Sequence, residues 1–351
     1  MARGMNRLME LESRIAALLS EAGKQAHIDA IETLSAGGNN RTYRVATASG
    51  PCLAKQYFSH AGDPRDRLGS EFAFLTYAAK AAPGWAPEAL AADRENGMAL
   101  YEFIPGCPFR PGEVTAGHVD AAANFFLALN AAIHRPAAQL PVASEACFSI
   151  GDHLALIESR LKKLQVLEPQ VTEDREARDL VEAIAASWQS IQTAIHAGAR
   201  ASSLDIAAPL ENAQRCISPS DFGFHNALLQ PDGQIRFLDF EYAGWDDPAK
   251  MAGDFFAQLA VPVPDWQFDR FIETCLAPFL RHEALIARTR LLRPAYRVKW
   301  CCIALNVFLP VNLARRKFAN PDLDERALKR VQLAKATRLY QSILSSEHGL
   351  H

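Results

Sequence analysis

The stretch "SPSDFGFHNALLQPDGQIRFLDFE", from Ser218 to Glu241, spaces three polar residues in a way that a solvated loop does not require. Asp221 and Asn226 precede the turn-forming run Gln-Pro-Asp-Gly-Gln, and Asp239 follows it, which predicts a β-hairpin. Because a hairpin brings its two outer ends together, we expect oxygens of Asn226 and Asp239 to reach one site.

These residue types suit chemistry at phosphate. Magnesium takes hard oxygen ligands, usually one or two protein side chains with phosphates and waters, and Asn226 and Asp239 fit that role. Asp221, one short loop away, is placed to accept the proton of a hydroxyl that attacks phosphorus. Each residue alone is more simply a turn cap or a strand end. The three at this spacing favour a site that holds metal ions against phosphate.

A glycine pair in "LSAGGNNRTYRV", residues 34–45, lies between two predicted strands. Gly37 and Gly38, followed by Asn39, would let backbone amides approach phosphate oxygens. The same Gly-Gly-Asn-Asn run also suits an ordinary hairpin turn. It lacks the Gly-Lys-Ser/Thr end of a Walker-type loop, so the sequence does not indicate a P-loop enzyme.

Lys55 lies in the apolar strand "CLAKQYF". A lysine that points into a protein interior needs a counter-charge, and Glu71 in the next predicted helix could supply it. The pair would then direct the lysine towards the α- and β-phosphates of a nucleotide. The alternative is a lysine on the open face of an edge strand.

Composition gives broad bounds. The 351 residues suffice for two domains that share one interface, each with its own core. A content of 49% hydrophobic and 22% charged residues is typical of a soluble globular protein. A formal charge of −3 gives no reason to expect nucleic acid or an acidic membrane as partner. The seven cysteines are odd in number and form no Cys-x-x-Cys pair, which favours reduced thiols in a cytoplasmic protein.

Hydrophobic patterning predicts an α+β fold in two domains. Short strands and one helix, "RLGSEFAFLTYAAKA", indicate a sheet-based domain over residues 1–105, and helical patterns dominate residues 106–351. Apolar residues at spacings of three and four predict an antiparallel helix pair between residues 150 and 195. The N-terminus reads as an amphipathic helix, and the apolar run over residues 300–314, too short to span a bilayer, reads as one buried helix.

Taken in order, these motifs resemble the aminoglycoside phosphotransferase and choline kinase family, relatives of the protein kinases. The resemblance runs from about Leu34 to about Phe256. It implies a protein-kinase-like fold with a small antiparallel-sheet lobe and a mainly helical lobe, and ATP with Mg²⁺ in the cleft between them. By that similarity Asp221 is the catalytic base, and Asn226 and Asp239 are the magnesium ligands.

The resemblance also implies the nucleotide contacts. Lys55 and Glu71 would form the phosphate-orienting ion pair, the glycine segment would cover the phosphates, and backbone groups of an interlobe hinge would hydrogen-bond adenine. The residues concerned are Gly37, Gly38, Asn39, Lys55, Glu71, Glu102, Phe103 and Ile104. One departure concerns the catalytic loop, where Pro219-Ser220 stands in place of the family's usual His-Gly, and Pro219 would stiffen the loop instead through its fixed φ.

An acidic run, "EYAGWDDPAKMAGDFF", follows the hairpin. Asp246 and Asp247 could face a cationic substrate, but Asp-Asp-Pro is favoured as a helix N-terminus. We expect Asp254 to support the catalytic loop. His225 is expected to pack in that loop rather than contact substrate or metal.

The sequence therefore predicts an ATP-dependent kinase that phosphorylates a hydroxyl of a small molecule. Acidic residues near the cleft would suit an aminoglycoside, choline or another amine, and a neutral sugar is equally compatible. A nucleotide-binding pseudoenzyme would normally lack one of Lys55, Asp221, Asn226 and Asp239, and all four are present. A helical interaction protein would require an exposed apolar face on the helices over residues 150–197. The sequence leaves a homodimer open.

Overall fold

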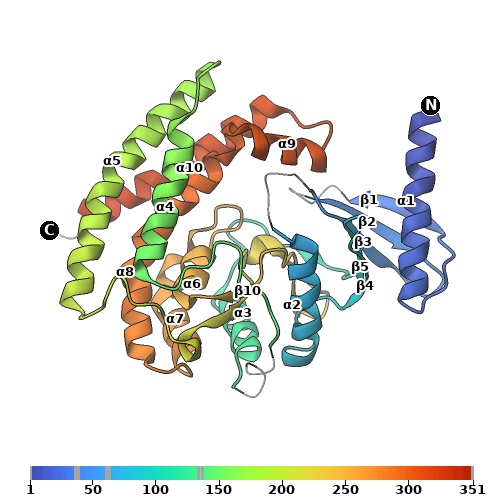
Figure 1. The fold of residues 1–351 in the computed structure, drawn as a ribbon, viewed down its shortest axis with the longest axis horizontal. Coiled ribbons are helices and arrows are strands. Elements are labelled where there is room, and N and C mark those ends of the chain that lie inside the picture. Colours follow the sequence, from blue (N-terminus) through green and yellow to red (C-terminus); the bar gives the residue numbers. More distant parts are fainter. Residues whose placement is uncertain (1, 35–39, 60–64, 133–134, 136–137, 349–351) are drawn as a thin grey trace.

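The computed structural model describes residues 2–34, 40–59, 65–132, 135 and 138–348 (Figure 1). The chain forms a five-stranded sheet flanked by two helices, followed by a larger helical part that contains two small sheets.

The N-terminal sheet is antiparallel, with strand order β1-β2-β3-β5-β4. Its strands are β1 (Ala30–Leu34), β2 (Arg41–Ala46), β3 (Cys52–Gln56), β4 (Ala89–Asp93) and β5 (Met98–Glu102). The flanking helices are α1 (Ala2–Glu21) and α2 (Arg67–Ala81). Helix α2 matches the predicted helix, and it begins where the Asp66 carboxylate accepts a hydrogen bond from the Gly69 amide.

The two faces of this sheet are covered by different helices (Figure 1). Along β5, Met98 and Leu100 pack in the cluster beneath α1, whereas Ala99 and Tyr101 pack in the cluster that includes α2. This follows from the alternation of side chains along a strand. Because β5 is buried on both faces, the helical part of the chain can pack against the α2 side while α1 closes the other.

The second part of the chain is mainly helical. Its α-helices are α3 (Ala116–Leu129), α4 (Ile150–Gln165), α5 (Thr172–Ala201), α6 (Pro248–Ala257), α7 (Phe268–Leu276), α8 (His282–Leu305), α9 (Pro310–Ala319) and α10 (Glu325–His348). Short 3-10 helices are η2 (Asn212–Gln214), η3 (Phe224–Asn226), η4 (Asp265–Gln267) and η5 (Asn306–Phe308). The strands are β6 (Cys107–Pro108), β7 (Cys216–Ser218), β8 (Ala227–Leu229), β9 (Ile235–Phe237) and β10 (Gly244–Asp246). Helices α4 and α5 form the predicted pair and pack on α8.

The main hydrophobic cluster spans both parts of the chain. Phe74 of α2 stacks on Phe240 at 4.5 Å between ring centroids, and Phe125 of α3 stacks on Phe237 at 5.0 Å. The aromatic side chains around the hairpin pack against α2 and α3 together, so this cluster lies across the interface between the two parts. Each part also has a cluster of its own, one beneath α1 in the sheet part and one among α4, α5, α8 and α10 in the helical part. The domain division at residue 105 remains a prediction.

The predicted single helix over residues 300–314 is wrong. Helix α8 ends at Leu305, η5 follows, and α9 begins at Pro310 after a bend of 74°. Proline has no amide hydrogen and a fixed φ, so it favours the first turn of a new helix over the middle of a long one. Among the described helices, none by itself has the length and apolar content to cross a bilayer, and the bent combination of α8 and η5 with α9 is the one pair that has both.

Candidate active site

The β8–β9 hairpin brings Asn226 and Asp239 to neighbouring positions, as the sequence predicted. Ala227 pairs with Phe237, and the Leu238 amide donates to the Asn226 carbonyl at 2.8 Å. Asn226 and Asp239 therefore stand just outside the paired ends of the two strands. Both line one cleft of about 550 Å³ together with Asp221.

Asp221 is held by the two polar residues that follow it. Its carboxylate accepts a hydrogen bond from His225 Nε2 at 3.1 Å, and its carbonyl accepts one from Asn226 Nδ2 at 3.0 Å. Burial raises the pKa of the Asp221 carboxyl, but the charge and hydrogen bond of His225 outweigh this and leave the pKa below its ordinary value. Asp221, with a side chain 30% exposed, is thus an ionised carboxylate open to the cleft.

The residue before Asp221 has an uncommon backbone conformation. Ser220 has φ of 67°, in the left-handed region that favours glycine. The sequence has serine and not glycine at this position, so side-chain hydrogen bonds hold the left-handed conformation instead. The Ser220 amide donates to Ser218 Oγ at 3.0 Å, and Ser220 Oγ accepts from Lys250 Nζ at 3.3 Å.

Lys55 points into the interior from β3, the central strand of the sheet, so the edge-strand alternative is excluded. Its Nζ lies 2.6 Å from a carboxylate oxygen of Glu71 and 2.6 Å from one of Asp239. Burial lowers the pKa of the Lys55 ammonium, but these carboxylates outweigh burial and raise it well above its ordinary value. Lys55 is therefore a fixed cation between α2 and the end of the hairpin.

Asp239 is crowded by negative charge. Burial raises the pKa of its carboxyl, Lys55 opposes that effect, and Glu241 and Glu71 add to it, so the pKa reaches about 7. A divalent cation would offset this repulsion. Asn226 donates its Nδ2 to the Asp221 carbonyl, so its Oδ1 is the atom that could ligate a cation. The donor set of Asp239 and Asn226 therefore fits Mg²⁺.

Glu71 has contacts that the sequence did not reveal. Besides Lys55, its carboxylate accepts from the Tyr57 hydroxyl at 2.5 Å and from the Phe240 amide at 3.1 Å. The Tyr57 hydroxyl also lies 2.6 Å from that of Tyr101. The tie to the Phe240 amide fixes the backbone next to Asp239. Tyr57 directly follows β3 and lies two positions after Lys55, so the alternation of side chains in an extended chain was the available signal.

Gly37, Gly38 and Asn39 lie outside the described residues. The next residue, Asn40, is buried, and its Nδ2 donates to Glu241 Oε2 at 2.6 Å while its Oδ1 accepts from the Phe58 amide at 3.1 Å. Glu241 ends the Asp-Phe-Glu run of the opening stretch. This contact, which sequence reasoning missed, links the residue after the glycine segment to the end of the hairpin that carries Asn226 and Asp239.

The proposed hinge residues lie at the end of β5. Glu102 uses its backbone amide to donate to the Glu88 carbonyl at 2.9 Å, and its carboxylate accepts from Arg236 at 2.8 Å. Phe103 lies under the Arg44 guanidinium, 5.4 Å from the ring centroid, and Ile104 is buried. Because the Glu102 amide is already used, the backbone amides of Phe103 and Ile104 are better candidates than that of Glu102 for contact with an adenine base.

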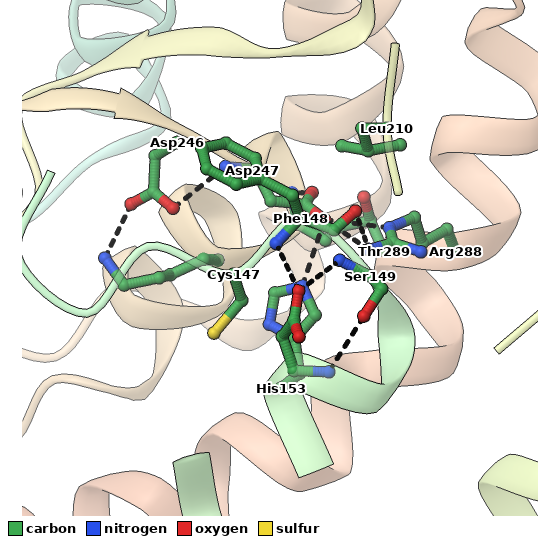
Figure 2. Close-up of polar contacts among 12 residues, drawn as sticks. Cys147, Phe148, Ser149, His153, Leu210, Asp246, Asp247, Arg288 and Thr289 are labelled. Atoms are coloured by element: carbon green, nitrogen blue, oxygen red, sulfur yellow. Dashed lines mark hydrogen bonds and ion pairs between the residues drawn. The ribbon is translucent and has the colours of Figure 1, made fainter. Parts of the chain in front are cut away.

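Asp246 and Asp247 are fully buried, so neither faces a substrate. Figure 2 shows their carboxylates in polar contact with other groups of the protein. Asp247 caps α6 by accepting from the Ala249 amide at 2.7 Å, as favoured from the sequence. It also contacts His153 Nε2 at 3.0 Å and accepts from Arg288 at 2.6 Å. Burial raises the pKa of the Asp247 carboxyl, and Arg288 and His153 outweigh this and lower it.

Asp254 reaches the catalytic loop only through an intermediary. Its carboxylate accepts from Lys299 at 2.8 Å and from the Trp300 indole at 2.8 Å. Lys250 lies 3.7 Å from Asp254 and donates to Ser220 in the loop. The expected support of the loop by Asp254 is therefore indirect. His225 was expected only to pack, but it holds the Asp221 carboxylate.

A search of curated proteins gave no match. Among solved structures, a choline kinase from Cryptosporidium parvum Iowa II superposes with a TM-score of 0.60 at 13% identity, covering 91% of this chain and 90% of that one. The choline kinase LicA from Streptococcus pneumoniae gives 0.56 at 16% identity, covering 97% and 99%.

A spectinomycin phosphotransferase solved with ADP and spectinomycin gives a TM-score of 0.51 at 11% identity, covering 94% of this chain and 98% of that one. At such identities the similarity concerns the fold, and it confirms the predicted α+β kinase-like architecture of a sheet lobe and a helical lobe. Residues 30–284 match the family described as "Phosphotransferase enzyme family". Since that match covers most of the chain, the protein belongs to this phosphotransferase family, as its motifs indicated.

Proposed function

We propose that this phosphotransferase transfers the γ-phosphate of ATP, with Mg²⁺, to a hydroxyl group of a small molecule. The observation that carries the proposal is the convergence of Lys55, Asp221, Asn226 and Asp239 from β3, the catalytic loop and the two ends of one hairpin. A fixed cation, an ionised carboxylate and two oxygen ligands are the groups that phosphoryl transfer requires.

The nucleotide would lie between the sheet and the hairpin. Lys55 would contact its phosphates, Asn226 and Asp239 would hold Mg²⁺, and the backbone of Phe103 and Ile104 would contact adenine. The segment with Gly37, Gly38 and Asn39 remains our candidate for covering the phosphates. Two similar folds support nucleotide use, because the spectinomycin phosphotransferase was solved with ADP and LicA with AMP.

When bound, Mg-ATP supplies the transferable phosphoryl group and positive charge beside it. Asp221 accepts the proton of the acceptor hydroxyl as that oxygen bonds to the γ-phosphorus and the bond from phosphorus to the bridging oxygen of ADP breaks. His225 keeps the Asp221 carboxylate in place. Lys55, fixed by Glu71, offsets charge on the phosphates, and such preorganised electrostatics supply much of the rate.

A release assay for ADP tests this function. The protein is incubated with Mg-ATP and a panel of aminoglycosides, amino alcohols, sugars and acidic hydroxyl compounds, beside Asp221→Asn and the control Asp179→Asn at an exposed position of α5. We expect turnover with one acceptor class, its loss in Asp221→Asn and its retention in Asp179→Asn. Equal turnover in Asp221→Asn, or no binding of Mg-ATP, would refute the proposal.

A nucleotide-binding pseudoenzyme is the second candidate. It would bind Mg-ATP with no turnover on any acceptor. The retention of all four residues argues against it, because Asp221, Asn226 and Asp239 line one cleft and Lys55 is ion-paired with Asp239.

A further inference from the structure

The cleft around Asp221 is lined by more cations than anions, although we expected acidic residues near it that would suit an amine and held a neutral sugar equally compatible. Four acidic residues line it: Glu145, Asp221, Asp239 and Asp254. Eight basic residues do so: Arg65, Arg160, Lys163, Lys250, Lys299, Arg315, Arg316 and Lys335. The two acidic residues that had suggested an amine, Asp246 and Asp247, are buried away from it.

Three of these cations are already neutralised by carboxylates. Lys250 pairs with Asp246 at 2.6 Å, Lys299 pairs with Asp254 at 2.8 Å, and Arg160 pairs with Glu145. These pairs are internal to the helical part of the chain. They account for two of the four acidic residues of the cleft, Glu145 and Asp254, while Asp221 and Asp239 are those assigned to base and metal.

Of the other five cations, three lie on the last two helices. Arg315 and Arg316 lie on α9 and Lys335 on α10, and we call these three residues the basic cluster. Within the described part of the chain, neither Arg316 nor Lys335 makes an ion pair with a carboxylate. Arg315 donates to Asn312 at 3.2 Å, but its Nε is buried and has no hydrogen-bond partner among the described residues.

Contacts to the sheet hold the helix that carries two residues of the basic cluster. Helix α9 is anchored to the sheet by Arg41, which donates to the Phe318 carbonyl at 3.0 Å and lies 4.2 Å from the centre of the Phe318 ring. Burial lowers the pKa of Lys335, and the charges of Arg338 and Arg316 lower it further. Like charges held together at a partly buried site are unfavourable until a negative group joins them.

The cluster is within electrostatic range of the proposed base. Arg316 interacts with Asp221 as well as with Arg315. The side chains of Trp300, Ile303 and Leu309 add apolar surface to the same cleft. A compound that placed an acidic group on the basic cluster would therefore lie beside Asp221, over an apolar wall.

We propose that the acceptor is an anionic hydroxyl compound, carrying a carboxylate or a phosphate that Arg315, Arg316 and Lys335 bind while its hydroxyl faces Asp221. This inference rests on the proposed function and names its acceptor class. A quaternary amine or a polycationic amino sugar would meet net repulsion at the same place.

Matched acceptors test the charge directly. ADP release from Mg-ATP is measured with glycerol, glycerate and glycerol 3-phosphate, and with glucose, gluconate, glucose 6-phosphate and glucosamine. We expect kcat/KM for an anionic member to exceed that of its neutral counterpart by at least about tenfold, since two or more charge-assisted hydrogen bonds form. The carboxylate and phosphate members tell the two acidic groups apart. Preference for a neutral or cationic member would overturn the inference and leave the proposed function intact.

Anion binding gives a second test that needs no turnover. The protein is saturated with Mg²⁺ and a non-hydrolysable ATP analogue, so that the nucleotide site is filled, and titrated calorimetrically with inorganic phosphate and with malonate. We expect Arg316→Gln and Lys335→Gln each to raise the Kd, at least about tenfold, for whichever of the two anions the wild type binds. The control Lys317→Gln, on α9 but paired with Glu325 outside the cleft, should bind as the wild type does.

The outcomes separate the two ideas. A wild type that binds the analogue but neither anion, or variants that bind anions equally well, would overturn the inference alone. Failure to bind the nucleotide analogue would refute the proposed function and the inference with it. If the variants instead raise the KM for ATP and leave the acceptor KM unchanged, the cluster serves the nucleotide and the inference is wrong.

Discussion

Lys55 Nζ lies 2.6 Å from a carboxylate oxygen of Asp239, 184 positions later in the chain. This ion pair joins β3 of the sheet to the end of the β8–β9 hairpin. Glu71 binds the same ammonium group from α2. Lys55 is thus fixed by two elements at once, and its position depends on how the sheet and the helical part of the chain pack.

Replacing Lys55 by Met should lower kcat/KM for Mg-ATP by about 10² or more, because the fixed cation beside the phosphates is lost. Steady-state kinetics at a temperature where the variant stays folded would measure this. Lys80→Met, at the exposed end of α2, is the matched control and should behave as the wild type does. A Lys55→Met enzyme within threefold of wild type would contradict the assigned role.

His225→Ala should reduce kcat about tenfold and leave the KM for ATP unchanged, because the Asp221 carboxylate loses the group that orients it. His225→Gln retains an N–H donor and should recover most of the loss. A structural role alone would instead lower the urea midpoint of both variants without rescue of kcat by Gln. Kinetics and urea unfolding on the same samples distinguish these results.

Asp247→Asn should lower the free energy of unfolding by about 3–5 kcal/mol, because it leaves the buried Arg288 guanidinium without its counter-charge. Asp269→Asn breaks an ion pair with Arg290 whose aspartate side chain is 61% exposed, and should cost less than about 1 kcal/mol. Urea unfolding compares the two. Similar losses of unfolding free energy in both variants would show that the buried Asp247 pair contributes no more to stability than the exposed Asp269 pair.

A pair of glycine substitutions should act in opposite directions. A Cβ added to Gly253 in α6 would lie 2.3 Å from Tyr296 Cγ, so Gly253→Ala should destabilise the protein by about 1–3 kcal/mol or more. At Gly117 in α3 the nearest such neighbour is 3.8 Å away, and Gly117→Ala should stabilise by up to about 1 kcal/mol. Thermal unfolding measures both shifts, and a neutral Gly253→Ala would refute the close packing of α6 on α8.

Glu145 should make stability depend on pH. Burial raises the pKa of its carboxyl, but Arg160 and Lys299 outweigh burial and lower the pKa from 4.5 to about 2. A lowered acid pKa stabilises the folded state above pH 4.5, and this stabilisation is lost as the pH falls towards 2. Since the side chain is 32% exposed, we expect about 1–2 kcal/mol.

Glu145→Gln lacks this group and provides the comparison. The difference in unfolding free energy between wild type and Glu145→Gln should shrink as the pH falls from 4.5 to 2. A difference that stays constant across this range would show that the Glu145 pKa is not depressed in the folded state.

Elements with strong local signals could be predicted from the sequence. The turn residues at 230–234 predicted the hairpin that aligns Asn226 with Asp239, and the spacing of Leu and Ile predicted α4 and α5. Strand β4, "ALAAD", was missed because it has no β-branched or aromatic residue, and β7 and β10 are three residues each. Their pairing depends on partners distant in the sequence.

The sequence by itself determined which residues could carry the chemistry, because the spacing of Asp221, Asn226 and Asp239 is a local property of one hairpin and its loop. Only the tertiary structure decided their surroundings. It joined Lys55 to Asp239, buried Asp246 and Asp247 with counter-charges of their own, and gathered Arg315, Arg316 and Lys335 at the cleft. The reason is that electrostatic interactions depend on distance in space and on burial, and neither is encoded in the spacing of residues along the chain.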